Sequence, residues 1–307
     1  MARPMPVIMN ATAGKGNGDD TAARIREAFA AAGAQVQVMA AASGEDIPLL
    51  ARRAVHAGHE VIVAAGGDGT VNAVATLVAG SKSALGVLPV GTLNHFARDA
   101  GIPLEMEAAA LAIVANHRAR VDVGAVNGRV FLNNSSIGLY PTMVIRRENR
   151  RRQGDGKWTA LFWASLTVLR KHAMLDLNLD VDGELQAHRT PLVFIGNNEY
   201  VIEGAEVGTR MGLRDGKLSV YITRRHGRRG LIALGLRSLV GSLRDALDLE
   251  AYTARRVTIA TRRKHLAVAT DGEVTVMETP LEYENRPGAL EVVVPLPPPA
   301  APRENTA

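Results

Sequence analysis

The sequence predicts an α/β protein with two domains, a parallel-sheet domain followed by a β-rich domain. Short apolar runs alternate with helical segments over the first part of the chain, which is typical of a parallel sheet with helices on both faces. After about residue 125, short strands follow one another with few helices between them. We therefore expect domains at residues 1–124 and 125–295, and a disordered proline-rich tail at 296–307.

The composition is that of an ordinary globular protein. Apolar residues make up 47% of the 307 residues and charged residues 22%, and the net charge is +5. The absence of cysteine excludes disulfides, thiolate metal sites and cysteine nucleophiles, and it fits a reducing cytoplasm. We see no signal peptide, and no apolar run approaches the roughly 18 residues of a membrane-spanning helix.

The elements of the first domain follow from hydrophobic spacing and from glycines that end helices. We expect strands at residues 6–10, 35–39, 61–65 and 84–88. Helices are expected at residues 20–32, 45–57, 70–78 and 105–115. Ligands of parallel sheets bind beyond the carboxyl ends of the strands. Asn10, residues 67–69 and residues 91–92 all follow strand ends, so three loops are expected at one crevice.

The glycine-rich string after the strand at 61–65 is the strongest local signal. Glycines there allow positive φ angles and close approach of the backbone, and the following helix start exposes N–H groups that suit a phosphate. Asp68 would repel a phosphate unless a cation intervenes, which indicates a nucleotide held with a metal ion. The alternative is a tight strand-to-helix turn without a ligand. Gly14-Lys15 lacks the flanking residues of a Walker A loop, so we exclude that motif.

The second domain is expected to contain short strands with two helical insertions, at residues 139–171 and 228–249. The expected strands lie at residues 121–126, 129–134, 175–181, 192–196, 217–223, 256–260, 266–269 and 290–294.

Several motifs, taken in order, resemble the diacylglycerol kinase catalytic family, which comprises bacterial lipid kinases related to sphingosine kinases and more distantly to NAD kinases. The resemblance covers about residues 5–295. It rests on residues 10–14, 66–72, 85–98, 122–124, 197–198, 215–218 and 271–273. The glycine-aspartate string alone would also suit an NAD kinase or a phosphofructokinase. The resemblance implies an N-terminal nucleotide domain, a C-terminal β-sandwich, and ATP and lipid meeting between the two.

The resemblance also implies roles for individual residues. Those expected to bind ATP are Asn10, Gly66, Gly67, Asp68, Gly69, Thr70, Val71, Asn72 and Thr92. Asp271 and Glu273 match the acidic pair of the catalytic motif, in which the glutamate is the usual proton acceptor. Asp215, with backbone carbonyls near Gly212 and Lys217, matches a Mg²⁺-binding segment.

An alternative reading of both acidic motifs is that Asp-Gly marks a hairpin turn. If residues 271–273 are extended, the two carboxylates share one face; if they form a turn, the pair is a solvated hairpin tip. Two residues depart from the family pattern. His95 stands where many members have aspartate, and the missing carboxylate is expected to weaken a hydrogen-bonded link to Asp68 and Asp215 that positions a metal. Ala40 replaces a threonine that often contacts the nucleotide.

A basic and aromatic segment predicts contact with an anionic membrane surface. Its cations are Arg146, Arg147, Arg150, Arg151, Arg152 and Lys157, and a helix carrying Trp158 and Trp163 follows. The alternative is a helix that packs on its own domain with solvated arginines. A second basic cluster lies at residues 224–229. No nucleic-acid motif is present, and a homodimer is left open.

These observations predict an ATP- and Mg²⁺-dependent lipid kinase that phosphorylates a hydroxyl of diacylglycerol or a related lipid. It would be cytoplasmic and peripherally membrane-associated, with a lipid substrate at the membrane surface. Two alternatives stay open: a soluble kinase of the NAD kinase type, and a non-catalytic nucleotide- or lipid-binding protein.

Overall fold

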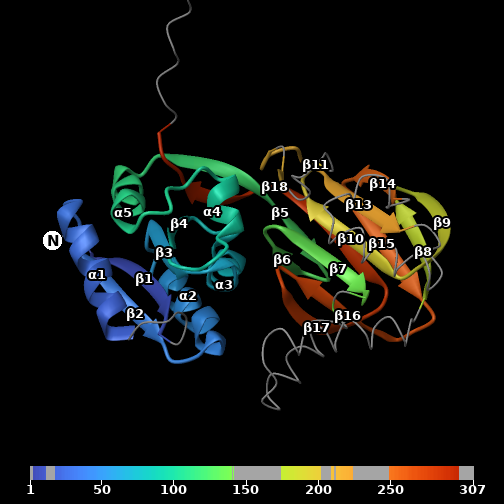
Figure 1. The fold of residues 1–307 in the computed structure, drawn as a ribbon, viewed down its shortest axis with the longest axis horizontal. Helices are drawn as coiled ribbons and strands as arrows, with labels where there is room; N and C mark the ends of the chain where they lie inside the picture. Colours follow the sequence, from blue (N-terminus) through green and yellow to red (C-terminus); the bar gives the residue numbers. More distant parts are fainter. Residues whose placement is uncertain are drawn as a thin grey trace, which may run out of the picture. The chain divides into compact units, whose positions relative to one another are not determined.

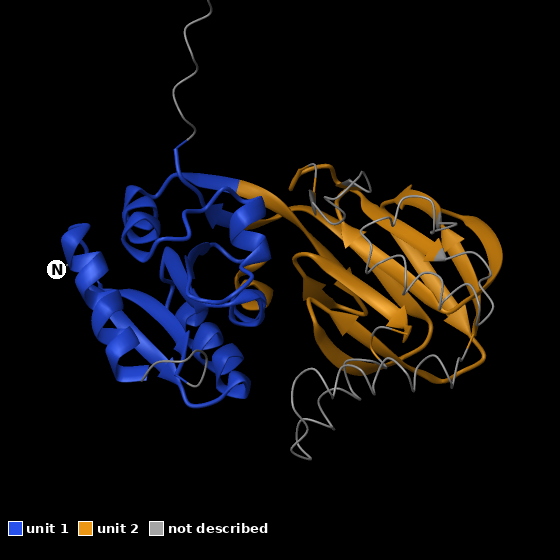
Figure 2. Ribbon diagram, in the orientation of Figure 1, with its two compact units in different colours: residues 1–74, 81–119, 291–307 blue, residues 75–80, 120–290 orange. Residues whose placement is uncertain are grey.

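The computed structural model describes residues 3–11, 18–139, 141, 174–201, 209–210, 212–223 and 249–296. The chain divides into two compact units (Figure 2). The first comprises Met1–Val74, Ser81–Ala119 and Glu291–Ala307, and the second comprises Ala75–Gly80 and Arg120–Leu290.

The first unit contains the predicted parallel sheet (Figure 1). Its strands pair in the order β2-β1-β3-β4. Their bounds are Met5–Asn10 for β1, Val36–Ala41 for β2, Val61–Gly66 for β3 and Ala84–Pro89 for β4. Every residue of β3 and β4 is buried, which explains their unbroken apolar sequence, since helices cover both faces of such a sheet. The α/β prediction is confirmed for this unit.

Helices alternate with these strands, as the sequence predicted. They are α1 Gly18–Ala31, the short 3₁₀ helix η1 Gly44–Asp46, α2 Ile47–His56, α3 Asp68–Val78, α4 His95–Asp99 and α5 Met106–Ala115. Helix α1 packs on α5, α5 packs on β4, and α2 packs on β1 and β3. The apolar stripe of α1, which includes Ile25 and Phe29, is fully buried.

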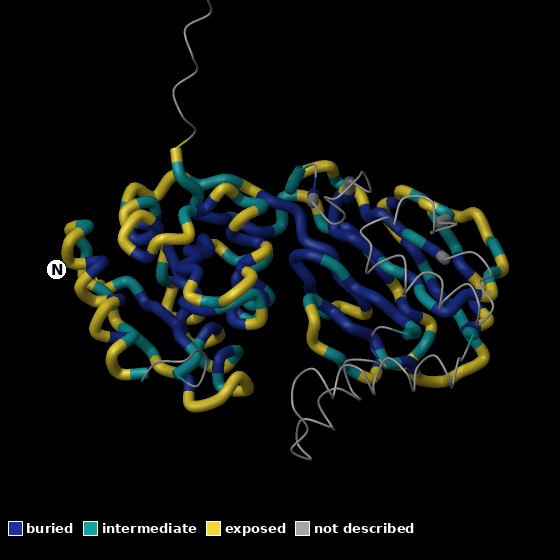
Figure 3. The backbone as a smooth tube through the Cα atoms, in the orientation of Figure 1, coloured by how far each residue is buried: buried dark blue, intermediate teal, exposed yellow. Residues whose placement is uncertain are grey.

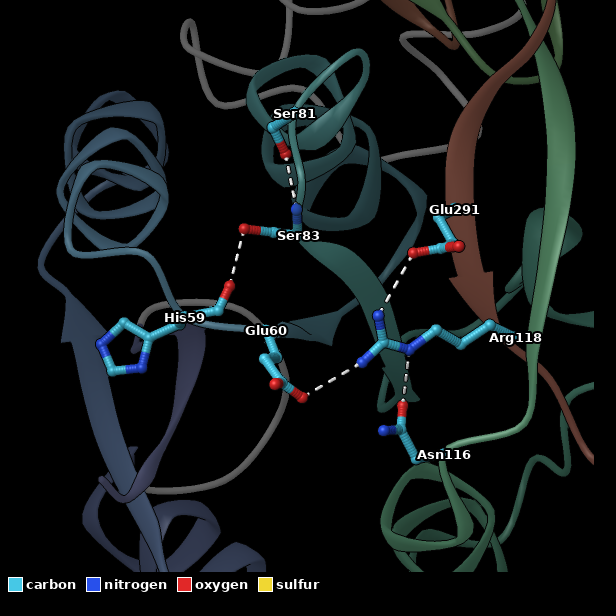
Figure 4. A network of polar contacts seen from close by, with 7 residues as sticks. All are labelled: His59, Glu60, Ser81, Ser83, Asn116, Arg118 and Glu291. Atoms are coloured by element: carbon cyan, nitrogen blue, oxygen red, sulfur yellow. Dashed lines mark hydrogen bonds and ion pairs between the residues drawn. The ribbon is translucent and has the colours of Figure 1, made fainter. Parts of the chain in front are cut away.

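An ion-pair network centred on Arg118 joins distant parts of the first unit (Figure 4). Its guanidinium contacts Glu60 Oε2 at 3.4 Å, Glu291 Oε2 at 3.3 Å and Asn116 Oδ1 at 3.0 Å. The Arg118 side chain is 27% exposed, so solvent screens the network only in part. These contacts tie the end of β18 (Leu281–Val293) to the strand–helix framework.

We expect Arg118→Met to lower the stability by about 1 kcal/mol, because it removes a partly buried network of two ion pairs. Urea unfolding measures the change. Arg24→Met is the matched control, since Arg24 lies exposed on α1 and makes no ion pair within the described chain. Equal unfolding midpoints for the two variants would show that the network does not stabilise the unit.

The second unit is sandwich-like, with an antiparallel sheet ordered β14-β13-β10-β7-β16-β17 and a second set of strands in which β18, β15, β8 and β9 pair in turn. The first sheet comprises β7 Asn134–Gly138, β10 Leu192–Asn197, β13 Leu218–Thr223, β14 Leu249–Ala254, β16 His265–Thr270 and β17 Glu273–Glu278. The remaining strands are β5 Arg118–Val126, β6 Arg129–Phe131, β8 Leu175–Val181, β9 Glu184–Thr190, β11 Tyr200–Val201, β12 Thr209–Arg210 and β15 Arg256–Thr261.

Alternating residues of these strands form one aliphatic core (Figure 3). In β8, Leu175, Leu177 and Leu179 point inward while the residues between them are more exposed. Phe131 and Tyr283 meet edge to face in the same core, with ring centroids 6.3 Å apart. The expected β-rich second part is therefore confirmed.

Some expectations were incomplete or lie outside the described residues. The strand expected over residues 129–134 ends at Phe131, and β7 begins at Asn134. Almost all of the two helical insertions, both basic clusters and nearly all of the expected tail fall outside the described residues. Within the described chain, no helix is long and apolar enough to cross a membrane.

Candidate functional site

The residues predicted to act fall into two groups, one in each unit. In the first unit, strand register aligns the relevant loops. Met9 pairs with Ala65, and Gly66 pairs with Pro89. Asn10 and the loops that follow β3 and β4 therefore leave the same edge of the sheet, as predicted.

The loops after β3 and β4 touch backbone to backbone. A Cβ placed on Gly91 would overlap Gly67 Cα and lie 2.8 Å from Asn94 Oδ1. A Cβ placed on Gly66 would overlap the Thr70 side chain. A side chain at either position would displace a neighbour. Glycine loops packed closely at a helix start are typical of phosphate sites, where backbone N–H groups form a cradle for the anion.

Side chains near the start of α3 have different surroundings. Thr70, Val71 and Asn72 are buried, at 6%, 3% and 5% exposure, and Val71 N already donates to Gly67 O at 3.1 Å. Asp68 is partly exposed, and its Oδ1 accepts a hydrogen bond of 3.2 Å from Phe96 N in α4. Gly69 is exposed at the helix start.

The loop after β4 carries a buried acceptor. Asn94 has a left-handed φ of 50° and donates from Nδ2 to Gly91 O at 2.9 Å. Its Oδ1 is buried and accepts no hydrogen bond within the described chain. A nucleotide hydroxyl or a bound water would satisfy it, so this loop fits the expected ATP site. Thr92 is exposed beside it.

The two departures from the family pattern lie at the surface. His95 and Ala40 are both exposed. Since Phe96 N binds Asp68, the loop contacts Asp68 without a carboxylate at position 95.

We expect Gly91→Ala to weaken ATP binding by about tenfold or more, because the new methyl group forces apart the two loops at a cost of about 1–3 kcal/mol. Titration calorimetry with an ATP analogue measures the affinity. Gly44→Ala is the matched control, because a Cβ at Gly44 meets no atom within 4 Å. Unchanged affinity in Gly91→Ala would exclude this cradle as the nucleotide site.

In the second unit, the side chain of Asp271 binds the protein's own backbone. Its carboxylate accepts hydrogen bonds from three consecutive amides: Leu132 N to Oδ2 at 2.7 Å, and Asn133 N and Asn134 N to Oδ1 at 2.8 and 3.0 Å. Arg210 is buried close by and donates to Leu132 O at 2.7 Å and Asn133 Oδ1 at 2.9 Å.

Burial raises the pKa of the Asp271 carboxyl, whereas the three amide hydrogen bonds and the charge of Arg210 act in the opposite direction. Because both oxygens accept from N–H donors, the ionised form is the one that fits. These donors fill three of the roughly four lone-pair sites of the carboxylate and fix its orientation. The geometry favours a structural role for Asp271 over proton transfer.

Asp271 and Gly272 form a turn, and Glu273 begins strand β17. Asp271 has φ of 48° and Gly272 has φ of 85°, as in a two-residue hairpin loop between β16 and β17. Of the two alternatives left open by the sequence, the structure has the hairpin turn. Asp271 turns inward, while the Glu273 side chain is 54% exposed and pairs with Arg129 at 2.8 Å.

The predicted metal segment is held by a buried carboxylate that sequence reasoning had assigned no role. Asp122 accepts hydrogen bonds from Gly216 N at 2.7 Å and Gly288 N at 2.8 Å, and its own N–H donates to Leu213 O at 2.8 Å. The motif at residues 122–124 had marked Asp122, but its partners are distant in sequence.

The fit of Mg²⁺ to this segment is partial. Asp215 is exposed, and its Oδ2 accepts from Glu199 N at 3.3 Å. A Cβ on Gly212 would lie 2.9 Å from Asp215 Oδ1, so this oxygen and the Gly212 backbone are close. The Lys217 carbonyl already accepts from Asn198 N at 2.9 Å and Asn285 Nδ2 at 3.2 Å. Asp215 and Gly212 suit a hard cation, whereas those two hydrogen bonds compete with a cation at Lys217. Within the described chain no three acidic or histidine side chains form a metal cluster.

Comparison with known proteins gives two family matches. Residues 4–126 match the model of the diacylglycerol kinase catalytic domain. Residues 140–294, half of the chain, match the model described as the YegS C-terminal NAD kinase beta sandwich-like domain.

Curated relatives include diacylglycerol kinases of Staphylococcus aureus strains JH9 and Newman, each 32% identical over 153 residues. The match covers 49% of this chain and 48% of the relative, so the chain spans about half the length of the curated relatives it matches.

Solved structures with a similar fold include two from Bacillus anthracis strain Sterne. One is described as a diacylglycerol kinase, with a TM-score of 0.68, 22% identity and coverage of 95% of this chain and 96% of that chain. Another, described as a candidate diacylglycerol kinase, has a TM-score of 0.72, 24% identity and coverage of 95% and 97%. At this identity the likeness shows the fold alone. The two domain matches show that the chain belongs to the family that joins a diacylglycerol kinase catalytic domain to a YegS-type C-terminal domain.

Proposed function

We propose that this protein is an ATP-dependent lipid kinase that transfers the γ-phosphate of ATP to a hydroxyl of diacylglycerol or a related lipid. The observation that carries the proposal is the division of roles in the Asp-Gly-Glu hairpin. Asp271 is bound internally by three amides and fixes the turn, and Glu273 remains exposed on it. An exposed carboxylate on a fixed turn suits a general base.

The reaction needs little covalent chemistry from the protein. Glu273 takes the proton of the lipid hydroxyl as that oxygen attacks the γ-phosphorus. The bond between the γ-phosphorus and the bridging oxygen breaks, and ADP leaves with the electron pair. The cradle formed by Gly66, Gly67 and Gly91 would hold phosphate oxygens through backbone N–H groups. Mg²⁺, held through Asp215, would neutralise phosphate charge.

The proposal includes where the reaction takes place, at a membrane surface. A lipid acceptor resides in a bilayer, so we propose a cytoplasmic protein that associates peripherally with an anionic membrane. The basic segment that motivated this expectation lies outside the described residues, and a homodimer stays an untested expectation.

A soluble acceptor is the second candidate. It is favoured by one observation, the match of residues 140–294 to a domain described as NAD kinase beta sandwich-like.

Lipid-stimulated formation of ADP tests the proposal. We expect ATP turnover in detergent micelles to rise on addition of diacylglycerol or another lipid with a free hydroxyl, and not on addition of NAD⁺. Mass spectrometry of the extracted lipid identifies the product. Stimulation by NAD⁺ alone would support the soluble alternative, and no stimulation by any acceptor would favour a non-catalytic binding protein.

A further inference from the structure

Arg129 lies beside the turn that carries Glu273, although 144 residues separate them. It is the first residue of β6 and follows the turn at Asn127-Gly128. This turn is anchored on the neighbouring strands, because Asn127 Nδ2 donates to Glu278 O at 2.9 Å and Asn127 Oδ1 accepts from Glu282 N at 2.7 Å. The backbone that carries Arg129 is thus fixed on both sides.

The Arg129 guanidinium binds three side chains around the hairpin turn. Nε donates to Thr270 Oγ1 at 3.1 Å, Nη1 donates to Thr275 Oγ1 at 2.8 Å, and Nη2 contacts Glu273 Oε2 at 2.8 Å. Thr270 closes β16 and pairs directly with Glu273 across the hairpin. The planar fork of arginine therefore fixes both strands and the glutamate together.

The contact occupies only one of the two carboxylate oxygens of Glu273. Oε1 makes no hydrogen bond or ion pair within the part of the chain that the structure describes. A short charge-assisted contact at Oε2 restricts the side-chain torsions of Glu273. The other oxygen stays available to accept a proton.

We propose that Arg129 is a positioning residue, which orients the Glu273 carboxylate so that Oε1 receives the proton of the acceptor hydroxyl. This inference rests on the proposed kinase function. It assigns Arg129 no contact with ATP or with the acceptor.

The first test replaces Arg129 and measures transfer of the γ-phosphate in a single turnover at saturating ATP and lipid. Arg129→Met should slow transfer by about 10- to 100-fold, as misplacement of a catalytic group does, with little change in the KM for ATP. Arg129→Lys should restore part of the rate, because it keeps the charge and loses the fork. Arg118→Met is the matched control: it also removes a guanidinium with three partners, but its transfer rate should equal that of the parent.

A double-mutant cycle with Glu273→Gln separates positioning from direct action. If Arg129 works through Glu273, Arg129→Met should cause no further loss in the Glu273→Gln background. If instead the double mutant loses the product of the two single-variant losses in transfer rate, Arg129 acts on the phosphate or the acceptor directly. That result would overturn the proposal. A parental rate in Arg129→Met would overturn it as well.

A measurement without substrate tests the contact itself. In nitrogen-labelled protein, the Nη2–Hη2 signal of Arg129, whose nitrogen contacts Glu273 Oε2 at 2.8 Å, should exchange slowly with solvent, and it should exchange faster in Glu273→Ala. If the signal is unchanged in Glu273→Ala, the contact does not exist in solution and the inference fails. If the contact is present but the parent transfers no phosphate to any acceptor, the proposed kinase function is wrong. The positioning role of Arg129, which depends on that function, is then wrong as well. Transfer slowed in Arg129→Met, with a melting temperature lowered no more than in Arg118→Met, is the result we expect.

Discussion

Asp271→Asn is expected to destabilise the protein by about 3 kcal/mol, since it breaks a partly buried, charged set of three hydrogen bonds. An asparagine oxygen can replace Oδ1 and accept from Asn133 N and Asn134 N. The amide NH₂ group would then face Leu132 N, where two donors meet. Arg210 would lose its buried counter-charge in the same step.

Urea unfolding monitored by circular dichroism measures this loss. Glu273→Gln is the matched control, because it makes the same kind of change two residues away on an exposed side chain, where ion pairs contribute about 1 kcal/mol or less. Equal unfolding free energies for the two variants would show that Asp271 does not anchor the hairpin.

Glu273→Gln is expected to reduce phosphate transfer by roughly 100-fold or more, because glutamine keeps the shape of the side chain and cannot accept the proton. ATP affinity should stay at the parental value, since the proposed role of Glu273 is limited to accepting the proton of the lipid hydroxyl. Single-turnover transfer and calorimetric titration of ATP give the two quantities. Turnover at the parental rate would remove Glu273 from the chemistry.

The parallel sheet was predictable because its signals are local. Strand β3 is a continuous apolar run that ends in glycine, and the register that aligns Asn10, Gly66 and Pro89 follows from parallel pairing. Strand β9 was missed because its residues Glu184–Thr190 are mostly polar and partly exposed, so pairing with β8 rather than periodicity defines it.

The acidic hairpin shows where sequence reasoning reaches its limit. The sequence Asp-Gly-Glu at residues 271–273 is compatible with a turn and with an extended segment. The choice depends on amides near residue 133, more than 130 residues away in the chain. The same holds for Asp122. Its hydrogen-bond donors, Gly216 N and Gly288 N, are distant in the chain, and nothing in the sequence indicates that they bind this carboxylate.

The most direct test of the central claim offers the protein two acceptors at once. Equal amounts of diacylglycerol in micelles and NAD⁺ in solution are incubated with γ-labelled ATP, and the label is separated between organic and aqueous phases. We expect label in the organic phase as a phosphorylated lipid. In Glu273→Gln, this organic-phase label should be lost. Label that enters NAD⁺ instead, or a lipid product that Glu273→Gln forms at the parental rate, would contradict it.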